Sequence, residues 1–120
     1  MKNLHSKSPD VLINEFKSYA YERREHMLDS TEVSNQDFII MKKIFDELQM
    51  RGDNCRKMFR GLLKDLEPNI RQAAACLSLW EANDLSAIPV LEEIVKLGIP
   101  QISLEAKWTL SEWRDKRLKQ

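Results

Sequence analysis

The sequence is poor in residues that break helices and in residues that cross-link chains. Of its 120 residues, only three are glycine, four are proline and two are cysteine. So few glycines and prolines favour long helices joined by short connections. The cysteines, Cys55 and Cys76, fall within helical patterns. We interpret them as reduced, partly buried thiols rather than as a disulfide.

The chain also lacks an excess of charge of either sign. Nineteen Lys and Arg residues balance nineteen Asp and Glu residues, and each half of the sequence is close to neutral by itself. Nucleic-acid binding usually needs a basic surplus that neutralises phosphates, so this balance argues against a nucleic-acid partner. With 32% charged and 42% hydrophobic residues, the composition is typical of a globular chain, and we expect one domain over residues 1–120.

Long apolar runs are absent as well. The N-terminal residues MKNLHSKSPD contain no apolar stretch of the kind found in secretory signals. No window approaches the ~20 apolar residues that a membrane span requires. We therefore expect a cytoplasmic protein that does not enter a membrane.

Signatures of catalysis and metal binding are missing too. The sequence has no HExxH, no cysteine pair at metal-binding spacing, no glycine-rich phosphate loop and no GxSxG. His5 and His26 are the only histidines, and we interpret both as solvated side chains. We expect no catalytic residue, no metal and no cofactor.

Apolar residues recur at helical spacing in six segments, and none alternates as a half-buried strand does. The first helix begins after Ser8 as cap with Pro9 in first position, and ends near residues 29–30. The second is expected to begin at residues 34–37 and to end at Arg51-Gly52. The other four are expected at about residues 53–66, 68–82, 86–97 and 101–117. The sequence therefore predicts an all-α fold in which residues 1–8 form a flexible tail and residues 9–52 form the leading helices.

Two of these helices carry further expectations. The third is expected to bury Met58, Phe59, Leu62, Leu63 and Leu66. The fourth is apolar on nearly all sides, which is typical of a central helix, and Trp80 at its end is expected in the core.

The fourth and sixth helices look alike. Leu77-Ser78-Leu79-Trp80 returns as Leu110-Ser111-Glu112-Trp113, a shift of 33 residues, and Ala73 matches Ala106 in the same register. Helix pairs that repeat at this period are typical of an α-solenoid. Short apolar matches between amphipathic helices also arise by chance, so coincidence remains open.

The segment Glu67-Pro68-Asn69-Ile70-Arg71-Gln72-Ala73-Ala74 resembles the opening of a HEAT-repeat first helix. The whole chain resembles a small bacterial HEAT-like family of unknown function, whose second helix ends in an Arg-Gly turn. The resemblance implies a short right-handed superhelix of about six helices, with HEAT-like helix pairs over residues 53–117. It also implies that Arg71 ties adjacent repeats by an ion pair. Ser103 or Leu104 stands where a second such Arg would be, which departs from the family pattern.

The sixth helix suggests where a partner binds. Leu104 and Trp108 point away from its core stripe, and they are either covered by the N-terminal segment or exposed as a contact patch. Glu105 and Glu112 share a face of the same helix and are also explained by a solvated stripe. An acidic group near the end of the fourth helix could contact a basic partner locally. The partner-binding residues predicted from these patterns are Leu104, Trp108, Glu105, Glu112, Glu81 and Asp84.

From the resemblance we expect a non-enzymatic protein-protein interaction module. The most concrete form, by analogy with small HEAT-like immunity proteins, is an inhibitor that binds and blocks a cognate bacterial toxin. Two alternatives stay open. One is a nucleic-acid-associated protein that uses the basic group Arg114-Lys116-Arg117-Lys119, although we prefer a solvated helix end for these residues. The other is a structural homodimer built on the Leu104–Trp108 face.

Overall fold

The structure, a computed structural model, describes residues 3–118. This range is helical, as the sequence predicts, and contains six α-helices with no strand among them. They are α1 (Pro9–Asp29), α2 (Thr31–Met50), α3 (Asp53–Arg60), α4 (Pro68–Ala82), α5 (Ala87–Leu97) and α6 (Ile102–Leu118). Two short 3-10 helices, η1 (Leu4–Ser6) and η2 (Gly61–Lys64), complete the order. Every helix between residues 3 and 118 is too short or too polar to cross a membrane.

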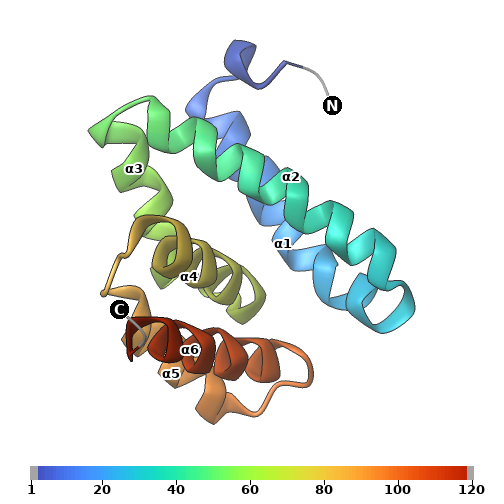
Figure 1. Cartoon of the computed structure of the whole chain (residues 1–120). Coiled ribbons are helices and arrows are strands. Elements are labelled where there is room, and N and C mark those ends of the chain that lie inside the picture. The colour runs from blue at the N-terminus through green and yellow to red at the C-terminus, as the bar shows by residue number, and fades with distance from the viewer. Residues whose placement is uncertain (1–2, 119–120) are drawn as a thin grey trace. The chain divides into compact units, whose positions relative to one another are not determined.

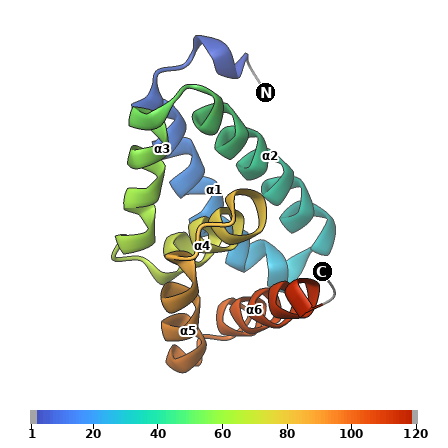
Figure 2. The same cartoon turned by 60° about the vertical axis from the view of Figure 1, so that its left-hand side comes forward.

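The chain forms two compact units. The first runs to Leu62 and the second begins at Leu63, whereas the sequence places the start of its helix pairs at residue 53. Figure 1 shows α1, α2 and α3 of the first unit, and Figure 2 shows α4, α5 and α6 of the second from another side.

Hydroxyl caps set the start of both long helices in the first unit. The side chain of Ser8 accepts a hydrogen bond from the Val11 amide, and Pro9 occupies the first turn, as predicted. Ser30 both ends α1 and begins α2, because its amide donates to the His26 carbonyl and its hydroxyl accepts from the Val33 amide. The predicted start at residues 34–37 is therefore wrong, and Ser34 lies buried inside α2.

Aromatic rings form the centre of the first unit. Phe59 of α3 lies edge-on to Phe16 of α1 and to Phe45 of α2, with ring centroids 4.9 Å apart in both pairs. All three rings are at most 2% exposed. Edge-to-face pairs add to the gain from burying apolar area, so Phe59 fastens the short α3 to the α1–α2 pair.

The third helix is shorter than expected. It ends at Arg60 and continues as η2, whose tighter winding changes the direction of the side chains that follow. Phe59, Leu62 and Leu63 are buried as predicted, but Met58 is 37% exposed and Leu66 is 94% exposed. The expectation that Leu66 is a core residue is wrong, because it assumed one unbroken helical period past Arg60. The expectation for Met58 is also wrong, because Cys55 and Phe59 occupy the buried side of α3.

In the second unit, α4 is the most buried helix, as its apolar circumference predicts: ten of its fifteen residues are buried. Left-handed residues, Asn83 and Gly98, end α4 and α5. Ser103 closes the turn into α6, since its hydroxyl donates to the Ile94 carbonyl and accepts from the Ile99 amide.

Residues of α4 and α6 contact each other in the register of the sequence repeat. The Gln72 amide donates to a Glu105 oxygen at 2.8 Å, and the Cys76 sulfur lies 3.2 Å from the Thr109 hydroxyl. Both pairs are 33 residues apart in the chain. Because later residues of α4 meet later residues of α6, the two helices run parallel, as Figure 1 also shows.

Candidate functional site

The outer face of α6 carries three exposed apolar side chains. Trp108 is 59% exposed, Leu104 is 43% exposed and Leu118 is 86% exposed. The opposite face is buried and includes Ala106 and Trp113. Leu104 and Trp108 are therefore exposed rather than covered. We call the row of Leu104, Trp108, Ser111, Asp115 and Leu118 the α6 outer face.

A groove of about 500 Å³ runs beside this face, between α5 and α6. Val95 and Leu110 line it with apolar atoms, and charged side chains of both signs surround them. Those charged residues are Glu92 and Lys96 of α5 and Lys107, Arg114 and Asp115 of α6. Ser111 also lines the groove and joins it to the outer face. The surface is therefore apolar in the middle and mixed in charge at its rim, as protein-protein contact regions are.

The two predicted acidic residues of α6 differ in their surroundings. Glu105 is half-buried and accepts the hydrogen bond from Gln72, so it helps to hold α4 against α6. Glu112 is exposed, one turn after Trp108. Of these two acidic residues, only Glu112 is an exposed neighbour of Trp108 that a partner could contact.

The acidic residues at the end of α4 lie elsewhere. Because α4 and α6 run parallel, Glu81 and Asp84 lie toward the C-terminal end of α6, away from Leu104 and Glu105. Glu81 is exposed, whereas Asp84 accepts hydrogen bonds from the amide and hydroxyl of Ser86. Asp84 thus orders the turn into α5, and the six predicted partner-binding residues do not form one patch.

Arg71 makes a bridging contact within the second unit. Its guanidinium lies 3.1 Å from a Glu93 oxygen of α5 and also donates to the carbonyls of Asp65 and Leu66. Its side chain is only 15% exposed. Arg71 therefore ties α4 to α5 and to the turn before α4, and its role between adjacent repeats stays a prediction.

Three basic residues at the end of α6 contact neighbours in the same unit. Arg114 pairs with Glu92 of α5 at 3.3 Å. Lys116 lies over the half-buried ring of Trp80, and Arg117 lies over Trp113. Trp80 is thus a platform for a cation rather than a fully buried core residue. Lys119, the fourth member of the predicted basic group, lies outside the described residues.

His26 is not the solvated side chain that we expected. Its Nδ1 forms a short hydrogen bond to Asp37 of α2, and the Asp37 side chain is 9% exposed. The hydrogen bond to Asp37 raises the pKa of His26 above its ordinary value of 6.5, while partial desolvation opposes this and the charges of Asp37, Glu22 and Glu25 add to it. The pair joins α1 to α2 near Ser30.

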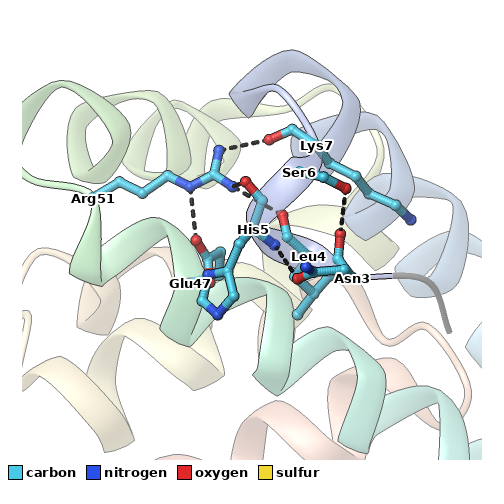
Figure 3. A network of polar contacts seen from close by, with 7 residues as sticks. All are labelled: Asn3, Leu4, His5, Ser6, Lys7, Glu47 and Arg51. Atoms are coloured by element: carbon cyan, nitrogen blue, oxygen red, sulfur yellow. Dashed lines mark hydrogen bonds and ion pairs between the residues drawn. The ribbon is translucent and has the colours of Figure 1, made fainter.

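The first unit also contains a polar clamp, shown in Figure 3. Arg51 donates through Nε to Glu47 at 2.8 Å and through its two terminal nitrogens to the carbonyls of Lys7 and Leu4. The His5 ring lies 2.8 Å from the other Glu47 oxygen. Residues 4–6, expected within a flexible tail, thus form a 3-10 turn that Arg51 holds.

Glu47 is the buried centre of this clamp, with a side chain that is 7% exposed. The Arg51 guanidinium holds the pKa of Glu47 below its ordinary value, with a smaller contribution from His5 and against the effect of burial. Sequence reasoning missed the clamp because Arg51 meets residues more than forty positions away. Its local signals were the spacing of four residues between Glu47 and Arg51 and the Arg51-Gly52 pair at the helix end.

The thiols are buried: Cys55 in the first unit, and Cys76 against Thr109 in the second. Between residues 3 and 118, no three His, Cys, Asp or Glu side chains gather as metal ligands would.

A second hollow lies along α1 in the first unit. Its volume is about 650 Å³, and an ion pair of 2.7 Å between Lys7 and Glu15 lies at its lining. Most of its remaining lining is polar or acidic, including Ser18 and Glu22. It has no apolar row comparable to the α6 outer face.

Comparison of the chain with models of protein families, with curated protein sequences and with solved structures finds no match. The resemblance to a HEAT-like family therefore stays a prediction from the residues quoted above.

Proposed function

We propose that this chain is a non-enzymatic protein-binding module that contacts its partner through the α6 outer face. The observation that carries the proposal is the exposure of Trp108 beside Leu104. Tryptophan is enriched among the residues that dominate binding energy, because it offers a large rigid apolar surface. The neighbouring groove between α5 and α6 extends this surface with an apolar floor and a charged rim.

The finer fold that we propose is a short HEAT-like solenoid in α4, α5 and α6. Its support is the register of 33 residues in which Gln72 meets Glu105 and Cys76 meets Thr109. Equivalent helices of stacked repeats run parallel and bring equivalent residues together, as these pairs do. The Arg71–Glu93 ion pair fits the tie that the HEAT resemblance implies.

The concrete form of the function that we propose is an immunity or inhibitor protein that covers the working surface of a bacterial toxin in the cytoplasm. Its support is the HEAT-like resemblance together with the exposed apolar row. The mixed rim of the groove suits a partner surface that carries charges of both signs.

A photo-crosslinking amino acid in place of Trp108 tests the proposal in the native host. The control carries the same amino acid in place of Ile39 of α2, which is 54% exposed in the first unit. We expect a specific adduct from position 108 and none from position 39. Adducts of equal yield from both positions would contradict a contact surface on α6.

The captured protein is then purified and its affinity measured directly. Trp108→Glu is expected to weaken binding by at least ~30-fold, as loss of a hot-spot residue does. The matched variant Ile39→Glu is expected to bind as the wild type does. Identification of the captured protein as a toxin supports the immunity form, and any other identity overturns that form while keeping the binding module.

A further inference from the structure

The residues of α6 have a chemical symmetry about Ser111, the middle residue of the α6 outer face. Leu104 lies seven residues before this serine and Leu118 seven residues after it. Four residues before it is Lys107, and four residues after it is Asp115. Both flanking charges are exposed, and neither forms an ion pair with another residue in the range 3–118. Along the helix the order is therefore apolar, basic, small, acidic, apolar.

The next residues inward keep the same symmetry. Trp108 lies three residues before Ser111, and Arg114 lies three residues after it. An aromatic face and a guanidinium attract each other, and Arg114 is exposed enough to make a second contact while it holds Glu92. The positions three, four and seven residues before Ser111 thus each have a complementary residue at the same distance after it.

From this order we propose that α6 is a self-association surface, on which a second copy of this chain docks antiparallel about Ser111. The proposal rests on the proposed function, because it names a partner for the same surface. A two-fold axis at Ser111 brings Leu104 of each copy to Leu118 of the other, and Lys107 to Asp115. Each contact therefore forms twice, as in any isologous interface.

Helix geometry allows this docking. Positions 104, 108, 111, 115 and 118 are spaced by four and three residues, which places them in one row along a helix. The small side chain of Ser111 at the crossing lets two helices approach to about 8–10 Å. At that separation Lys107 can reach Asp115 of the second copy. Parallel docking would place Lys107 beside Lys107 of the second copy, so the charges select the antiparallel arrangement.

The expected dimer dissociates on dilution. One helix of seventeen residues is ~25 Å long and offers an interface near the lower end of the specific range. Light scattering on the full chain between ~1 µM and ~1 mM should show the mass rise from one copy to two. A mass of one copy across the whole range would overturn the proposal.

Charge exchange tests the pairing itself. Lys107→Asp places two acids together and Asp115→Lys places two lysines together, so each variant should weaken the dimer at least ~10-fold. The double variant with both substitutions restores opposite charges and should recover most of the dimer. Both residues are exposed, so folding is expected to survive, and circular dichroism checks it. A double variant as weak as the single ones would contradict the antiparallel register.

A cysteine at the symmetry axis gives a second test. Ser111→Cys should form a disulfide-linked dimer under mild oxidation, because the two thiols lie at the crossing point. Glu112→Cys is the matched control: it is exposed on the same helix but turned ~100° away, and should link far more slowly. The native thiols are buried in both variants. Equal linkage at the two positions would overturn the register.

The outcomes separate this proposal from the proposed function. A monomer whose position 108 still captures a different protein overturns self-association and keeps the binding module. A dimer whose position 108 captures only a second copy supports both the α6 surface and self-association, and it overturns the toxin as partner. A monomer that captures nothing at position 108 overturns both.

Discussion

The two units differ in how they place their phenylalanines and tryptophans. In the first unit, Phe16, Phe45 and Phe59 are all at most 2% exposed and meet in one cluster. In the second unit, Trp113 is buried, Trp80 lies under a lysine and Trp108 is 59% exposed. The first unit packs three of its rings in its core, although Tyr21 is 54% exposed, while the second unit exposes one of its three tryptophans. Binding capacity is therefore expected in the second unit.

The two units also differ in how deeply they bury the carboxylates of their polar pairs. The first unit buries the carboxylates of Asp37 and Glu47 and pairs each with a cationic or histidine side chain. In the second unit, Arg71 and Arg114 pair with the exposed carboxylates of Glu93 and Glu92. Buried charges cost much free energy when a partner is removed, whereas exposed pairs contribute little. Removing one partner of a polar pair should therefore lower the free energy of unfolding more in the first unit than in the second.

The largest effect is expected from the aromatic cluster. Phe59→Ala should lower the free energy of unfolding by about 3–5 kcal/mol, because it leaves a cavity between Phe16 and Phe45. Urea denaturation followed by circular dichroism measures this loss. Met58→Ala, at the neighbouring and 37% exposed position, should change stability by less than ~1 kcal/mol. A small loss for Phe59→Ala would contradict the ring cluster.

The next effect is expected from the clamp. Arg51→Met leaves the buried Glu47 carboxylate without its main donor and should cost about 1–3 kcal/mol. It should also speed hydrogen exchange at the amides of residues 4–7, whose carbonyls lose the guanidinium. Lys42→Met is the control, since the exposed Lys42–Asp46 pair should contribute at most ~0.5 kcal/mol. Equal losses for the two variants would argue against the clamp.

The His26–Asp37 pair gives a pH-dependent effect. The pKa of His26 is raised in the folded state, so its contribution is complete below the unfolded pKa of about 6.5 and is lost as pH rises through the folded pKa. The stability difference between wild type and His26→Gln should therefore be largest below about pH 6 and shrink at alkaline pH. Denaturation at a series of pH values measures it, and a difference that grows with pH would reverse this sign.

Glu47 titrates in the opposite sense. Its pKa is lowered in the folded state, so its contribution is present above about 4.5 and is lost as pH falls through the folded pKa. The two effects fall in separate pH windows, so His26→Gln can be measured while Glu47 stays ionised.

The smallest effect on stability is expected from the largest exposed side chain. Trp108→Ala should change the free energy of unfolding by less than ~0.5 kcal/mol, because most of the ring already contacts water. Trp113→Ala, five residues later and 8% exposed, should cost about 3 kcal/mol or more. Comparable losses of unfolding free energy for the two variants would show that the Trp108 ring is packed against the protein rather than exposed to solvent.

Local signals in the sequence predicted the all-helical class and several of the helix ends. Ser8 and Pro9 mark the start of α1 because capping depends on residues within one turn. The sequence predicts too late a start for α2 because Ser30, Thr31 and Ser34 all offer hydroxyls that could cap it. The structure uses the first of them, so that one residue ends α1 and caps α2.

The site was predictable only in part, for a similar reason. The helical period alone points Leu104 and Trp108 outward, and the structure has both exposed. The period does not show that Glu105 is held by Gln72 or that Asp84 is held by Ser86, because those bonds depend on tertiary packing and turn geometry. At the clamp, Arg51 and Glu47 are four residues apart, but the hydrogen bonds from Arg51 to Lys7 and Leu4 join distant parts of the sequence, so no local pattern shows them.

The placement of the tryptophans has a practical consequence for optical experiments. All three lie in residues 63–118, so the intrinsic emission excited at long wavelength comes from the second unit alone. Trp108 is the most exposed of them, and a quencher in the solvent should reach it first. The native chain thus carries a built-in reporter at the proposed contact surface, and a docked partner should shield its fluorescence without any added label.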